Sequence, residues 1–147
     1  MPTLPAYAEL HCVSNFTFLR GASHPEELIE CACELGYRAL ALTDECSVAG
    51  AVRAHIEACN RDFKLIIGSE LRLVDGPRLV LLATNREGYG NLSDLITRAR
   101  RAATKGTYQL RRDDLATGAP DCLALLIPDE EPDLQAIQWL EIGRAHV

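Results

Sequence analysis

The apolar residues of this chain follow two periods that alternate along its length. Short apolar runs and two-residue alternation predict strands, whereas apolar residues recurring every three or four positions predict helices. The run at 39–43 is apolar at almost every position, which is typical of a strand covered on both faces. The pattern predicts strands at 7–13, 39–43, 64–73, 79–83 and 122–127, with helices at 24–35, 48–60, 91–104 and 133–140.

Local signals mark the ends of several of these elements. Ser23, followed by Glu26 three residues later, has the pattern of a capping box, and Gly36 stops the first helix. Asp75 and Gly76 supply turn chemistry between two strands, which predicts a hairpin. Repeated alternation of strand and helix predicts an α/β fold with a mainly parallel sheet, either a barrel or an open sheet.

The size and composition are those of one globular domain. The chain has 147 residues, of which 48% are hydrophobic and 24% charged, enough for a sizeable core. No run approaches the roughly 20 apolar residues of a membrane span, and the start lacks a signal-peptide pattern, so we predict a cytoplasmic protein without membrane contact. The six cysteines lack Cys-x-x-Cys spacing and are predicted to be reduced thiols.

The charge distribution gives two alternatives for one segment. A net charge of -6 argues against a nucleic-acid-binding unit. Residues 98–112, however, carry six basic residues and no acidic ones. This basic strip is either a solvated helix face or a weak nucleic-acid contact, for which the candidates are Arg98, Arg101, Lys105, Arg111 and Arg112.

Three candidate metal ligands stand near the ends of predicted strands. His11, Asp44 and Glu70 would converge if their strands are parallel, because ligands bind at the carboxyl ends of such strands. Glu9 and Glu45 are nearby carboxylates of suitable type. Four of these residues also have a purely structural alternative. His11 is also consistent with a core histidine, and Asp44 with a cap of the following turn. Glu45 is consistent with a solvent-facing carboxylate, and Glu70 with an ion pair to Arg72 or Arg78.

The last seven residues differ from the rest of the chain. The sequence Glu-Ile-Gly-Arg-Ala-His-Val at 141–147 resembles the translation of a sequencing adapter. We therefore predict a domain at 1–140 and a non-native read-through tail at 141–147. His146 is excluded from the candidate site on this ground.

Several motifs together resemble a known family. The runs at 9–25, 41–47 and 67–70, followed by 79–83 and 88–92, resemble the polymerase-and-histidinol-phosphatase (PHP) domain, in particular the N-terminal PHP domain of bacterial error-prone DNA polymerases. The resemblance implies a distorted seven-stranded (β/α)7 barrel, truncated here on its C-terminal side. In active members of the family, the strand ends hold up to three metal ions and hydrolyse phosphoesters.

The chain departs from the family's ligand set at three positions. The usual His-x-His reads His11-x-Val13, the usual Asp-His reads Asp44-Glu45, and a further expected histidine reads Arg78. The resemblance therefore implies a degenerate metal site at His11, Asp44 and Glu70, with Glu45 and Glu9 as weak substitutes. We expect at most one weakly held divalent ion (zinc, manganese or magnesium) and no exonuclease activity.

The resemblance also implies a function for the parent protein. It would be a DNA-directed DNA polymerase of damage-induced mutagenesis and translesion synthesis, with this domain as a scaffold lacking catalytic residues and with magnesium in a polymerase core elsewhere. The implied partners are template-primer DNA, a sliding clamp and mutagenesis accessory proteins. The alternatives are a metal-dependent phosphoesterase of the PHP superfamily and a partner-binding module.

Overall fold

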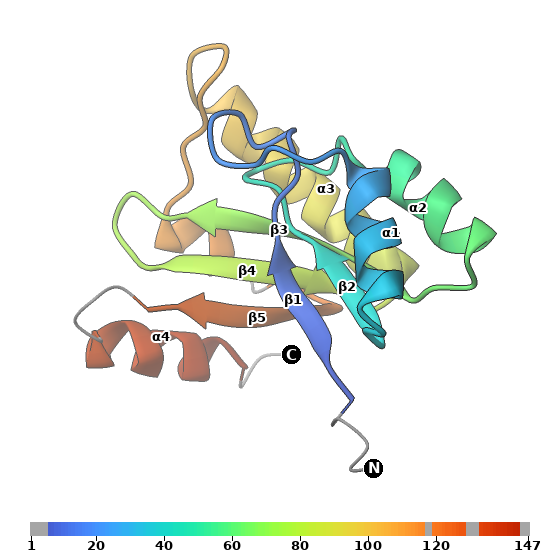
Figure 1. Ribbon diagram of the computed structural model, residues 1–147. Helices are drawn as coiled ribbons and strands as arrows, with labels where there is room; N and C mark the ends of the chain where they lie inside the picture. Colours follow the sequence, from blue (N-terminus) through green and yellow to red (C-terminus); the bar gives the residue numbers. More distant parts are fainter. Residues whose placement is uncertain (1–5, 117–118, 129–132, 145–147) are drawn as a thin grey trace.

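A single curled sheet forms the centre of the molecule. The computed structural model describes residues 6–116, 119–128 and 133–144. The strands lie in sequence order across the sheet, which curves as part of a barrel wall (Figure 1). They are β1 (Ala8–Cys12), β2 (Ala39–Leu42), β3 (Leu65–Arg72), β4 (Arg78–Ala83) and β5 (Cys122–Ile127).

The sheet is mixed. β1 with β2 and β2 with β3 are parallel pairs, whereas β3 with β4 and β4 with β5 are antiparallel. The hairpin predicted between β3 and β4 is confirmed, because the turn over residues 73–77 is too short for a parallel return. The prediction of a mainly parallel sheet is wrong for the second half, where β5 also returns antiparallel.

Helices cover the sheet in two groups. α1 (Pro25–Glu34) and α2 (Ala51–Asn60) pack on each other, with α1 against β2 and α2 against β3. α3 (Arg86–Arg101) lies against β3 and β4. A short 3-10 helix (Arg112–Leu115) precedes β5, and α4 (Leu134–Arg144) packs beside β5 (Figure 1). Among the described residues no helix is long and apolar enough to cross a membrane.

Two buried clusters lie between the sheet and its helices, and a third, with Val80 at its centre, is formed by strand residues alone. Leu71 and Leu79 of the sheet pack with Leu92 of α3 in one buried cluster. Ile29 and Leu42 belong to a second cluster, which joins α1 and α2 to β2. The described cysteines are free thiols, of which Cys46 is buried while Cys31 and Cys59 are exposed.

Two helix starts differ from their predictions. The first helix has its N-cap at His24, whose N–H donates to the Glu27 carboxylate at 2.7 Å, so the predicted box at Ser23 and Glu26 is wrong by one residue. Pro25 at the first helical position sets this register. α3 begins at Arg86, because the Asn85 side chain accepts the Gly88 N–H at 2.9 Å and caps the helix earlier than position 91.

The predicted tail is described only in part. The α4 helix continues through Arg144, whereas residues 145–147 lie outside the described residues. The division of the chain at residue 140 therefore stays a prediction.

Two glycines in the first turns of α3 provide a matched test of how closely that helix packs against Asp121. A Cβ on Gly88 would lie 2.0 Å from the Asp121 carbonyl oxygen, whereas a Cβ on Gly90 would meet nothing within 4 Å. We expect Gly88→Ala to lower the free energy of unfolding by about 1–3 kcal/mol. Gly90→Ala should raise it by roughly 0.5–1 kcal/mol, since alanine favours a helix. Urea unfolding of both variants checks this, and equal effects would contradict the close contact.

Candidate functional site

The fold brings the three predicted ligands to one edge of the sheet. His11 is in β1, Asp44 follows β2 and Glu70 is in β3. An isolated bridge pairs Glu45 with Glu70, and the Cys46 N–H donates to the Glu70 carbonyl at 2.8 Å, so the chain after β2 stays beside β3. The Asp44 and Glu70 side chains are each only 1% exposed.

Asp44 holds the loop between β1 and α1. Its Oδ1 accepts from the Ser14 N–H at 2.7 Å and from Thr17 Oγ1 at 2.6 Å, and its Oδ2 accepts from Ser14 Oγ at 2.7 Å. Thr17 Oγ1 in turn accepts the Glu45 N–H at 3.0 Å. Both oxygens of the carboxylate are therefore engaged in anchoring this loop.

Glu70 is the centre of an ion-pair network. Arg20 donates to it through two nitrogens, Nη1 to Oε1 at 2.8 Å and Nη2 to Oε2 at 3.0 Å. Nε2 of His11 lies 2.6 Å from Oε2. Burial raises the pKa of Glu70, but the hydrogen bonds from Arg20 and His11 outweigh it and hold the pKa below its ordinary value.

Arg20 is the residue that sequence reasoning missed. Its Nη1 also lies 2.8 Å from Glu45 Oε2, so one guanidinium joins two carboxylates. The hydrogen bond to Glu70 is the main cause that raises the pKa of Arg20. Arg20 stands within the run 9–25 that carried the family resemblance, but nothing local in the sequence indicates its partners. Arg78, one of the two arginines expected to pair with Glu70, places its Nη1 3.9 Å from Glu70 Oε1.

Glu45 is held from its other side by the segment after α3. Tyr108 donates through its hydroxyl to Glu45 Oε1 at 2.8 Å, and burial is the main cause that raises the pKa of this phenol. The Arg100 guanidinium donates to the Cys46 carbonyl at 3.0 Å and lies 5.5 Å from the centre of the Tyr108 ring. Loops from both halves of the sheet therefore meet at Glu45.

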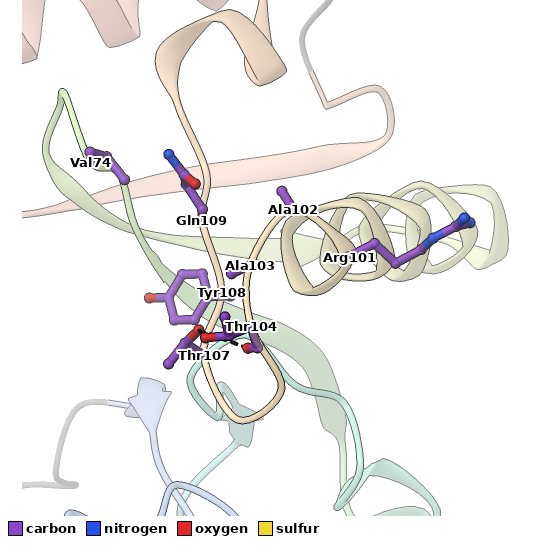
Figure 2. Close-up of a pocket in the computed structure, with 8 residues that line it drawn as sticks. All are labelled: Val74, Arg101, Ala102, Ala103, Thr104, Thr107, Tyr108 and Gln109. Atoms are coloured by element: carbon purple, nitrogen blue, oxygen red, sulfur yellow. Dashed lines mark hydrogen bonds between the residues drawn. The ribbon is translucent and has the colours of Figure 1, made fainter.

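A shallow cavity lies beside Tyr108 and is separate from the predicted ligands. Its volume is about 650 Å³, and it is bounded by the end of α3 and the segment that follows (Figure 2). The lining residues are Val74, Arg101, Ala102, Ala103, Thr104, Thr107, Tyr108 and Gln109. Arg101 is the one predicted nucleic-acid contact that lines it.

The basic strip does not present one face. Arg100 points inward to the loop after β2, and Arg98 pairs with Asp94 on the same helix at 3.0 Å. Arg112 lies 5.3 Å from the Trp139 ring centre, on the side of the molecule that carries α4. Lys105 and Arg111 are exposed in the segment after α3, and their nucleic-acid contact stays a prediction.

The described side chains do not fit a divalent metal ion. Glu9 accepts from the Tyr7 hydroxyl at 2.8 Å and from the His11 N–H at 2.9 Å, away from Glu70. Among the described residues, no three His, Cys, Asp or Glu side chains are grouped so as to hold a metal. The oxygens that a metal would need accept hydrogen bonds from Arg20, Ser14 and Thr17.

Comparison with curated proteins gives close relatives of much greater length. The chain is 60% identical to the error-prone DNA polymerase of Ralstonia pickettii, over 93% of this chain and 14% of that protein. It is also 60% identical to the error-prone DNA polymerase of Dechloromonas aromatica, over 94% of this chain and 14% of the relative. The chain therefore spans about 14% of the length of these relatives.

Solved structures and a family profile agree on the fold. A proposed metal-dependent phosphoesterase from Bifidobacterium adolescentis superposes with a TM-score of 0.56 at 23% identity, over 67% of this chain and 34% of that one. An amidohydrolase from Chromobacterium violaceum superposes with a TM-score of 0.55 at 26% identity, over 66% and 34%. The profile of the PHP domain matches residues 9–137. These matches confirm a truncated PHP barrel, and the chain belongs to the PHP domain family.

Proposed function

We propose that this chain is the N-terminal PHP scaffold of an error-prone DNA-directed DNA polymerase that acts in damage-induced mutagenesis and translesion synthesis. The polymerase assignment rests on 60% identity to error-prone polymerases over more than nine-tenths of the chain. The scaffold role rests on one observation, the Arg20 guanidinium that joins Glu45 to Glu70 at the edge where the family binds metals.

Arg20 takes the place of a metal ion in this role. A guanidinium is planar, permanently charged and able to bind a carboxylate through two parallel hydrogen bonds, which gives it strength and direction. A metal at Glu70 would have to displace Arg20 and leave its positive charge close by. Val13 offers no ligand, and Arg78 adds a second positive charge 3.9 Å from Glu70. The site therefore stabilises the fold and does not activate water.

The chemistry of the proposed polymerase then belongs to a different part of the longer protein. Nucleotidyl transfer would use magnesium in that core, and no residue of this chain is assigned a catalytic role. Template-primer DNA is the proposed substrate, with a sliding clamp and mutagenesis accessory proteins as proposed partners in the cytoplasm. Primer extension across an abasic template by the full-length protein tests the assignment. Absence of any nucleotide incorporation would contradict it.

One solved neighbour favours a second function, metal-dependent phosphoester hydrolysis. Manganese separates the two functions better than zinc, because the exposed thiols of Cys31 and Cys59 attract softer ions. We expect calorimetric titration of this chain with Mn²⁺ to give no binding tighter than about 0.1 mM, a free energy of about -5.5 kcal/mol. Two tightly bound equivalents per chain, with Arg20 intact, would favour the hydrolase instead.

Removal of Arg20 tests the scaffold directly. Arg20→Ala leaves a carboxylate that is 1% exposed with His11 as its remaining close partner, so we expect the free energy of unfolding to fall by about 2–3 kcal/mol. Arg98→Ala is the matched control, because it removes an exposed arginine–carboxylate pair and should cost at most about 0.5 kcal/mol. Chemical denaturation of both variants gives the comparison, and equal losses would refute the special role of Arg20.

The lowered pKa of Glu70 predicts how stability changes with acid. Because the folded pKa lies below the ordinary value of 4.5, the contribution is complete above about pH 4.5 and is lost as the pH falls through the folded pKa. Glu70→Gln should therefore flatten the decline of the unfolding free energy between about pH 5 and pH 3. Parallel declines in the variant and the parent chain would contradict this assignment.

A further inference from the structure

A thiol and an imidazole lie side by side near the end of α2. Sγ of Cys59 is 3.6 Å from Nε2 of His55 and 3.9 Å from its Nδ1. The two residues are four positions apart in the helix, which places them on one face, about a turn apart. Both side chains are exposed, so small molecules in solution can reach this thiol–imidazole pair.

The chain after α2 turns back and forms a cavity against this pair. Asp62 has a φ of 50°, in the left-handed region, and the Phe63 N–H donates to the Ala58 carbonyl at 2.8 Å. These two features reverse the chain at the end of the helix and bring residues 62–65 beside its last turn. The resulting cavity has a volume of about 310 Å³ and is lined by the thiol–imidazole pair on the helix side and by residues 62–65 on the other.

The backbone that carries the pair is held by contacts within the chain. β3, which follows the cavity, is paired with β2 on one side and with β4 on the other, so the cavity is not at an open edge of the sheet. α2 lies beside α1 (Figure 1), and Arg61, directly after α2, donates to Glu30 of α1 at 2.7 Å. The place of the pair is therefore set by elements that the structure describes in full.

The lining of the cavity offers both signs of charge next to apolar surface. Phe63 and Leu65 are partly buried and pack against the core cluster between α1, α2 and β2. Lys64 and Asp62 are exposed and line the same cavity. A small molecule with both a carboxylate and an ammonium group, as in amino-acid-derived thiols and disulfides, matches this lining.

We propose that Cys59 is a thiolation site, at which the thiol exchanges with a low-molecular-weight disulfide derived from an amino acid while His55 serves as the base. The thiolate is the nucleophile in such an exchange, and an adjacent imidazole activates a thiol by accepting its proton. The cavity is at the start of β3, whereas Glu70 is near the end of this strand. The inference therefore goes beyond the proposed polymerase scaffold and does not depend on it.

The exchange balances without a further oxidant. His55 takes the proton from Cys59, whose sulfur attacks one sulfur of the disulfide. The S–S bond of the disulfide breaks as the new S–S bond to Cys59 forms. The departing sulfur takes the proton back from His55, which leaves a mixed disulfide on the protein and one free thiol. The Cys59 sulfur is oxidised and the departing sulfur is reduced.

Competition between two exposed thiols of the same chain tests the proposal. This chain and the full-length protein are each treated with glutathione disulfide near neutral pH, and the mixed disulfides are located by peptide mass spectrometry. We expect Cys59 to react at least about threefold faster than Cys31, the exposed thiol of α1. Cys46 is buried and should stay unmodified, which verifies that the protein is folded. A smaller ratio of the two rates in either protein would overturn the proposal.

His55→Ala separates the action of a base from mere exposure of the thiol. Without the imidazole, the rate at Cys59 should fall to within about twofold of the rate at Cys31, which itself should not change. Ile56→Ala is the matched control, because it shortens a side chain that is 56% exposed on the same helix without removing a proton acceptor. A rate at Cys59 that is the same in His55→Ala as in the parent protein would overturn the proposal.

Discussion

The arrangement at the edge of the sheet depends on one guanidinium placed between two carboxylates. Glu70 is 1% exposed, and a buried carboxylate without a strong partner is costly. Arg20 satisfies it through two hydrogen bonds and uses the same Nη1 atom to reach Glu45. Because Arg20 comes from the loop after β1, Glu45 from the loop after β2 and Glu70 from β3, this interaction fixes three segments relative to one another.

The neighbouring contacts extend this constraint in two directions. Asp44 fixes the first loop through Ser14 and Thr17, which positions Arg20 for its two partners. Tyr108 reaches Glu45 from the segment after α3 and so connects the helical layer over β3 and β4 to the same point. At the place where the family resemblance implies a metal site, the oxygens of Asp44 and Glu70 accept hydrogen bonds from Ser14, Thr17 and Arg20.

The sequence was informative where periodicity and topology determine structure. An apolar run at 39–43 became the fully buried β2, and the turn at Asp75 and Gly76 became the hairpin of β3 and β4. Parallel pairing of β1 to β3 brought His11 and Glu70 together, as the positions of the strand ends had indicated. These features follow from local chemistry and from the rule for strand ends.

Other features were not accessible from the sequence because they depend on three-dimensional contacts. The role of Arg20 requires a loop conformation set by Asp44, 24 positions away in sequence, and no periodic pattern encodes it. The direction of β5 depends on how the chain leaves α3, and the register of α1 was decided by Pro25 in preference to the serine before it.

A crystal structure of this chain grown with an excess of manganese tests the Arg20 bridge most directly. We predict electron density for the Arg20 guanidinium between Glu45 and Glu70, with no ion within bonding distance of Glu70. A manganese ion bound to His11 and Glu70, with Arg20 displaced from both carboxylates, would contradict it.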